Sequence, residues 1–196
     1  KDSLSLVLEM NYIIASLHKK SYLLASIDSI QWNNNEVQAF LYVGEKVVWA
    51  NISKGNISEN LLRKIDYKER IFQNKPVKAK QLFQLEQKLI DYSANNGYPF
   101  ARVFLDSVET NEDGIRGVLN FEKDQLITFD SVKIIGNTKT KAKFIQNYLQ
   151  IKPNTPFNQQ RIDNYKRIIE QLQSVRIKKH YQLAFKNDKA SLYLFL

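Results

Sequence analysis

The sequence predicts an α+β protein built from repeats, each running strand–helix–helix–strand–strand. Two landmarks occur twice at nearly the same separation. The Gly-Asn pairs at Gly55 and Gly136 lie 81 residues apart, and the Asn-x-Pro motifs at Asn74 and Asn154 lie 80 residues apart. A shared offset of this kind indicates a structural repeat. Four apolar helix positions match at the same spacing: Leu82 with Ile162, Leu85 with Tyr165, Leu89 with Ile169, and Tyr92 with Leu172.

The first complete repeat is expected over residues 45–124. A strand from about residue 46 leads into a helix that begins near Asn56. A second helix is expected from Pro76 to about Asn95, because proline suits the first helical turn. Two strands, over 98–108 and 115–121, then form a hairpin.

The second complete repeat is expected over residues 125–196, in the same order of elements. It comprises a strand over 126–135, helices over 138–148 and 157–173, and a closing hairpin of 177–185 with 190–196. A short interval of 3 residues, Lys186-Asn187-Asp188, forms the turn of that hairpin.

The first 44 residues contain only the back half of a repeat. An amphipathic helix over residues 4–18 is followed by a hairpin whose turn includes Asn33-Asn34-Asn35. No strand precedes the helix. The helix positions expected to form a buried stripe are Leu6, Val7, Met10, Ile13, Ile14 and Leu17. Domains are thus expected over 1–44 (partial), 45–124 and 125–196.

The element order resembles the polypeptide-transport-associated (POTRA) domain, most closely that of bacterial outer-membrane assembly and translocation proteins of the BamA/TamA type. The residues that carry the resemblance are Phe129–Asn137, Ile151–Phe157 and Gly97–Val103, together with the closing strand 190–196. The resemblance implies tandem β-α-α-β-β units, each with a three-stranded mixed sheet covered by two helices.

The resemblance also implies a function and a location. It predicts the periplasmic portion of an outer-membrane protein, with a membrane barrel lying outside these residues. The expected partners are unfolded outer-membrane clients and periplasmic or lipoprotein partners, bound by β-augmentation at a sheet edge. A two-partner-secretion transporter is an alternative within the same class.

In the resembled family the second strand of each unit lies at the sheet edge, which here means the segments 99–107 and 177–185. The residues expected to bind a partner there are Phe100, Arg102, Phe104, Lys178, Lys179 and His180. The basic members would add charge to the groove. Phe100 and Phe104 share one face of their strand, and we expect that face to pack beneath the helices. This interpretation argues against base stacking by the two rings.

A nucleic-acid-binding protein is the rival from another class. The chain has 29 basic and 20 acidic residues, a net charge of +9, and such an excess attracts polyanions. The lysines are scattered, however, with a local cluster only at Lys139, Lys141 and Lys143. We therefore favour a solvated basic surface, and nucleic acid is an unlikely partner on this evidence.

An enzyme is the poorest alternative, because no acid–base or nucleophilic constellation can be assembled. The two histidines, His18 and His180, lack metal-like neighbours, and the absence of cysteine excludes thiolate sites. The pairs Asp28-Ser29 and Asp106-Ser107 are expected to end strands through local backbone bonds. No catalytic residue, metal or cofactor is predicted.

Overall fold

The chain forms two compact units, which the computed structural model describes over residues 3–33, 36–138, 140–172 and 175–196. One unit comprises Lys1–Glu86 with Phe104–Asn120, and the other comprises Gln87–Val103 with Phe121–Leu196. This division follows compactness in space, so a unit can take parts of two repeats. The repeat boundaries expected at residues 45 and 125 remain a prediction.

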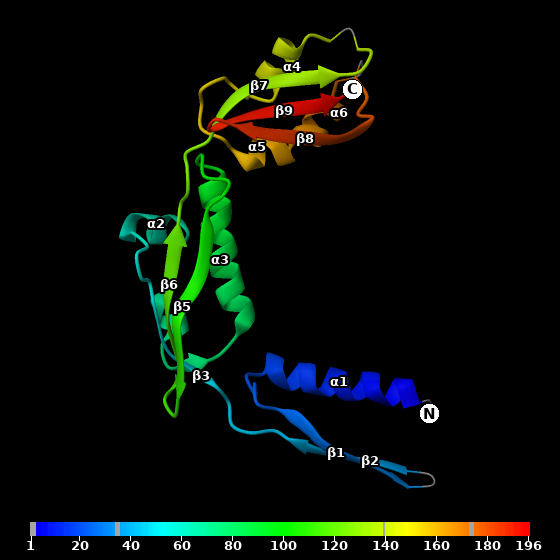
Figure 1. The fold of residues 1–196 in the computed structure, drawn as a ribbon, viewed down its shortest axis with the longest axis vertical. Coiled ribbons are helices and arrows are strands. Elements are labelled where there is room, and N and C mark those ends of the chain that lie inside the picture. Colours follow the sequence, from blue (N-terminus) through cyan, green and yellow to red (C-terminus); the bar gives the residue numbers. More distant parts are fainter. Residues whose placement is uncertain (1–2, 34–35, 139, 173–174) are drawn as a thin grey trace. The chain divides into compact units, whose positions relative to one another are not determined.

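The N-terminal elements are a helix and a hairpin, as expected from the sequence. Helix α1 (Ser3–Lys19) is followed by the antiparallel strands β1 (Ser26–Asn33) and β2 (Glu36–Tyr42), which form a two-stranded sheet (Figure 1). β1 begins only at Ser26, because residues 22–25 form a turn in which the Ala25 N–H donates to the Tyr22 carbonyl at 3.1 Å. The predicted turn residues 34 and 35 lie outside the described residues.

The buried stripe expected along α1 is largely wrong. Met10 is buried, but Val7 is 45% exposed and Ile13 is 44% exposed. The apolar spacing makes the helix amphipathic, yet burial also requires elements to pack against that face. Residues 3–44 supply only one short hairpin for this purpose.

The middle repeat follows the predicted order with short additions. Its elements are β3 (Val48–Ser53), α2 (Glu59–Lys64), the 3₁₀ helix η1 (Glu69–Phe72), β4 (Lys75–Pro76), α3 (Ala79–Ala94), β5 (Arg102–Asn111) and β6 (Gly114–Glu122). The sheet order is β4-β3-β6-β5, and β3 runs parallel to β6. The structure therefore confirms a mixed sheet, with the second long strand of the repeat at one end.

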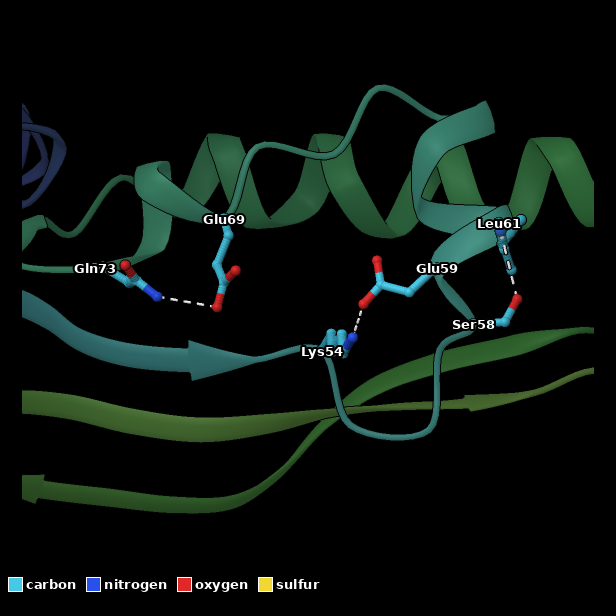
Figure 2. Close-up of polar contacts among 6 residues, drawn as sticks. All are labelled: Lys54, Ser58, Glu59, Leu61, Glu69 and Gln73. Carbon is cyan, nitrogen blue, oxygen red and sulfur yellow. Dashed lines mark hydrogen bonds and ion pairs between the residues drawn. The ribbon is translucent and has the colours of Figure 1, made fainter.

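Polar side chains shape the connection from β3 to β4 (Figure 2). Ser58 caps α2, because its Oγ accepts a bond from the Leu61 N–H at 3.4 Å. Lys54 forms an ion pair with Glu59 in the first turn of the same helix. Further along, the Gln73 amide donates to Glu69 at 3.0 Å. These contacts hold the turn after β3 and stabilise η1 by local bonding.

The Asn-x-Pro motifs do not begin helices, so that prediction is wrong. Pro76 pairs with Val48 as part of β4, and Pro156 forms an antiparallel bridge with Thr128. The asparagines adopt left-handed backbone conformations, with φ of 50° at Asn74 and 60° at Asn154. Asparagine tolerates this region well, and proline is accepted where its missing N–H faces away from the sheet. Each motif therefore turns the chain back against the opening strand of its repeat.

The last repeat forms a three-stranded sheet in the order β7-β9-β8, with β9 between the other two strands (Figure 1). Its elements are β7 (Thr128–Ile135), α4 (Ala142–Tyr148), α5 (Gln159–Asp163), α6 (Tyr165–Glu170), β8 (Lys179–Lys186) and β9 (Lys189–Phe195). β7 runs parallel to β9, and β8 runs antiparallel to it. The helix predicted over 157–173 is thus divided between α5 and α6.

The helices of the last repeat cover one face of its sheet and form a closed core. Phe129 and Phe157 are fully buried, and their ring centroids lie 5.3 Å apart. β9 contributes alternate residues to this core, as expected for a strand with one covered face. The buried positions from the sheet and helices include Val132, Ile145, Leu149, Ile162, Tyr165, Ile169, Ala190, Leu192 and Leu194.

The glycines of the two Gly-Asn pairs occupy tight turns with positive φ. Their φ angles are 52° at Gly55 and 137° at Gly136. A Cβ added at Gly55 would collide with the carbonyl oxygen of Leu119, and one at Gly136 with that of Leu196. Both landmarks of the repeat therefore mark places where backbone approaches backbone too closely for a side chain.

Candidate functional site

Strands β5 and β8 each lie at the end of their sheet, as predicted for the second strand of a repeat. Among the strands that the structure describes, β5 pairs with β6 alone and β8 pairs with β9 alone. A terminal strand presents a row of unpaired backbone N–H and C=O groups along its outer side. These two edges are the candidate functional site.

Toward the opposite edges of the two sheets lie β3 and β7, and the first residues of both strands are covered by other segments. β4 pairs with β3 through Val48 and Trp49. In the last repeat, the Phe129 N–H donates to the Thr155 carbonyl at 2.8 Å, and the Phe157 N–H donates to the Ile127 carbonyl at 2.9 Å. The Asn-x-Pro segments thus occupy the outer sides of the opening strands, so the second strands offer the more open edges.

The Asp-Ser pairs lie within strands and do not end them, which corrects the sequence prediction. Ser107 lies inside β5 with φ of 51°, and its N–H bonds to the Asp106 carboxylate at 2.7 Å. In β1 the pairing register shifts between Ile27 and Ser29. An extra residue of this kind is a β-bulge, which increases local twist. The uninterrupted part of the β5 edge therefore precedes Ser107.

A groove of about 990 Å³ runs along the first half of β8, against the helical side of the unit. From the helices it is lined by Asp163, Tyr165, Lys166 and Glu170. From β8 and the residues just before it, the groove is lined by Arg176, Ile177, Lys178, Lys179, His180 and Tyr181. A chain that paired with β8 would therefore also contact these side chains.

Three rings form a cluster in the groove. Tyr165 and Tyr181 meet edge to face with centroids 4.9 Å apart, and His180 stacks on Tyr165 at 6.0 Å. His180 Nδ1 lies 3.4 Å from the Tyr165 hydroxyl, so one ring nitrogen is held near a phenol. Burial raises the pKa of the Tyr181 phenol. A bond from the Gln159 amide opposes that rise, and the Asp163 carboxylate adds to it. Tyr181 is therefore a neutral hydrogen-bonding group at physiological pH.

Phe100 and Phe104 do not pack beneath the helices, so that expectation is wrong. Phe100 is 43% exposed and Phe104 is 39% exposed, whereas Val103 and Leu105 are the half-buried residues between and beside them. Residues of the strand alternate between the two faces as predicted, but Val103 and Leu105 lie on the more buried face and Phe104 faces outward. Phe100 precedes β5 and contacts Phe185 of β8 with centroids 4.8 Å apart.

The remaining predicted residues are distributed unequally between the two edges. Arg102 is paired with Glu122 at 2.8 Å, so its charge is already balanced. Lys178, Lys179 and His180 all line the groove beside β8. Whether they bind a partner stays a prediction.

Tyr165 and Lys166 also line the groove, although neither was predicted to bind a partner. Tyr165 was assigned to the core by its helical spacing, and it is indeed only 5% exposed. One ring can serve both purposes when it lies at the margin of the core. The available signal was the concentration of aromatic and basic residues in both 165–167 and 178–181.

Neither a metal-binding cluster nor a membrane-spanning helix occurs among the described residues. No three histidine or acidic side chains there are grouped as a metal ion would require. No helix in the described ranges has both the length and the apolar character needed to cross a membrane.

The arrangement of two strand–helix–helix–strand–strand units with mixed sheets is that of the POTRA fold. Residues 127–175 match the POTRA family model, described as a surface antigen variable number repeat. The comparison with curated protein sequences found no match. The chain therefore has the fold of POTRA domains in tandem, and the family model itself matches the last repeat.

Solved structures with a similar fold include POTRA domains 3–5 of BamA from Haemophilus influenzae. That similarity has a TM-score of 0.63 at 13% identity and covers 97% of this chain and 79% of the other. BamA from Haemophilus ducreyi lacking POTRA domains 1–3 gives a TM-score of 0.53 at 15% identity. It covers 74% of this chain and 29% of that one. At these identities the likeness establishes the fold.

Proposed function

We propose that this chain is the periplasmic part of a bacterial outer-membrane protein that assembles or transports other proteins. It serves there as a scaffold that receives unfolded outer-membrane clients and periplasmic or lipoprotein partners. The similarity to POTRA domains of BamA supports this location. The proposal assigns the chain no catalytic step and no cofactor.

The binding mode is β-augmentation, in which an extended segment adds a strand to β5 or β8. One observation carries this proposal: both strands end their sheets, while the opposite edges are partly covered by the Asn-x-Pro segments. Backbone groups supply most of the bonding in such a complex. Because every client has the same backbone, this mode suits a receptor for chains of many sequences.

Site-specific cross-linking tests the proposal directly, because the natural chain has no cysteine. Single cysteines are introduced at exposed edge positions, Ala184→Cys in β8 and Phe104→Cys in the part of β5 that precedes the irregularity at Ser107. Matched controls on the central strands are Lys189→Cys in β9 and Arg116→Cys in β6. Extended peptides that carry one activated thiol are expected to couple to the edge positions and to leave the central ones unmodified.

Backbone methylation of the peptide provides the second arm. N-methyl groups at alternate residues remove the donors needed for strand pairing and leave the side chains unchanged. Coupling at the edges is expected to fall at least about tenfold, since several backbone bonds are lost. Equal coupling of methylated and unmodified peptides would exclude β-augmentation. Binding of nucleic acid in place of peptide, with a steep salt dependence, would favour the rival function.

A further inference from the structure

The two open edges differ in charge. Beside β8, the groove is lined by four basic side chains, Lys166, Arg176, Lys178 and Lys179. Along β5, by contrast, the exposed charges from Asp106 onward are acidic, including Glu109. Arg102, at the start of β5, already pairs with Glu122. A client chain would therefore meet positive potential at one edge and neutral to negative potential at the other.

The acidic residues in the β8 groove already have partners. Glu170 lies 4.0 Å from the Lys166 ammonium, and Asp163 accepts a bond from the Gln159 amide at 2.7 Å. Within the described part of the chain, no carboxylate lies within 4.0 Å of the three other groove cations, Arg176, Lys178 and Lys179. The groove therefore has cationic side chains that a ligand could still neutralise.

The same groove also has an aromatic wall. Tyr165, His180 and Tyr181 contact one another through their rings, with centroid separations between 4.4 and 6.0 Å. Such a surface accepts a flat or branched apolar side chain, and the phenol and imidazole edges can hydrogen-bond to a carboxylate. Basic side chains and rings thus lie together along the first half of β8.

We propose that the β8 groove selects extended segments that are acidic and carry at least one aromatic or large apolar side chain. This inference rests on the proposed function, because it specifies the client class for one of the two edges. Backbone pairing with β8 holds the segment, the ring cluster accepts its apolar side chain, and Arg176, Lys178 and Lys179 pair with its carboxylates. The β5 edge lacks the cations and does not make this selection.

The test uses two synthetic peptides of ten residues with the same apolar residues and strand propensity. One carries glutamates at the remaining positions, and the other carries lysines. Fluorescence anisotropy measures their affinity, and coupling to Ala184→Cys reports that binding occurs at β8. The acidic peptide is expected to bind at least about tenfold more tightly, because charge complementarity adds to backbone pairing. Added salt should reduce the difference.

Charge reversal provides the matched control. Lys178→Glu with Lys179→Glu is expected to weaken the acidic peptide about tenfold, because each reversal removes an attraction and adds a repulsion. Lys141→Glu with Lys143→Glu makes the same change in net charge at exposed positions outside the groove. That second variant is expected to bind as the parent does. Circular dichroism confirms that both variants are folded.

The possible results separate the two proposals. If both peptides couple to Ala184→Cys with equal affinity, the selectivity is wrong and β-augmentation stands. If the two double variants weaken binding equally, the preference reflects only the net charge of +9 and the groove is not selective. If neither peptide couples to β8 or β5, the proposed function itself fails, and the selectivity fails with it.

Discussion

The last repeat and the N-terminal helix–hairpin share the same final elements but differ in how completely they bury them. In the last repeat, β9 has β7 on one side and β8 on the other, and Ala190, Leu192 and Leu194 are fully buried. Among the described strands, the corresponding strand β2 pairs with β1 alone. Val37 is half-buried, and the other residues of β2 are exposed. The opening strand and first helix of a repeat therefore complete its core.

The same difference explains why the apolar face of α5–α6 is buried, whereas that of α1 is partly exposed. The stripes on α1 and on α5–α6 look alike in sequence, but only the second packs against a covered sheet. Among the α1 residues, Met10 is buried and its neighbours on the stripe are partly or largely exposed. Apolar periodicity defines a face, and the surrounding elements decide whether that face leaves water.

The largest expected effect is a core truncation in the last repeat. Phe129→Ala removes a fully buried ring that packs against Phe157, and it should reduce the free energy of unfolding by about 3–5 kcal/mol. Trp32→Ala on β1, where the side chain is 57% exposed, should cost about 0.5 kcal/mol or less. Urea unfolding followed by circular dichroism measures both. Similar losses would show that the N-terminal hairpin is as well packed as the last repeat.

A smaller effect is expected from two glycine substitutions. Gly136 has a φ of 137°, and the Cβ of Gly136→Ala would collide with the Leu196 carbonyl. We therefore expect this variant to lose about 2–3 kcal/mol of unfolding free energy through strain. Gly44 has a φ of 66°, and the atom nearest to the Cβ of Gly44→Ala would be Cε1 of Tyr42, at 3.2 Å. This second substitution should cost about 1 kcal/mol. Melting temperatures would rank the two variants, and the opposite order would contradict the comparison.

The N-terminal segment has one buried polar anchor, whose removal should have a moderate effect. Ser21 donates a bond of 2.6 Å to the Val77 carbonyl, and its own carbonyl accepts from the Val47 N–H at 2.8 Å. Ser21→Ala leaves the Val77 carbonyl without this donor and should cost about 1 kcal/mol. Ser29→Ala, at an exposed position, is the control. An unchanged urea midpoint for Ser21→Ala would show that the contact adds no stability.

The smallest effect concerns the pH dependence of the last repeat. The hydroxyls of Ser131 and Ser191 donate to Asp130 at 2.8 and 2.9 Å, and these bonds hold the pKa of that carboxyl below its ordinary value of 3.8. Because the pKa of Asp130 is lowered in the folded protein, these bonds contribute their full stability at pH values above the ordinary pKa. That contribution is lost as the pH falls through the pKa of the folded protein.

Asp130→Asn should therefore flatten the loss of stability as the pH falls below about 4. Urea unfolding of the parent and variant between pH 2 and 6 tests this, with the pKa of Asp130 followed by NMR. An Asp130 pKa at or above 3.8 would contradict the prediction.

Much of the fold could be predicted from the sequence because it depends on local patterns and on their recurrence. The repeat offset, the order of elements and the edge position of β5 and β8 all agree with the structure. The groove was only partly predicted. Lys178, Lys179 and His180 were expected to bind, whereas Tyr165 and Lys166 come from a helix whose side chains meet β8 only after folding.

The sequence by itself determined where strands, helices and tight turns occur, since backbone preferences and apolar spacing act within a few residues. Tertiary structure alone decided that the Asn-x-Pro segments pair with β3 and β7, that Phe104 faces outward, and that the α1 stripe stays partly exposed. These outcomes depend on strand register and on which distant segment covers a face. Both are set by packing between elements far apart in the chain, which no local pattern encodes.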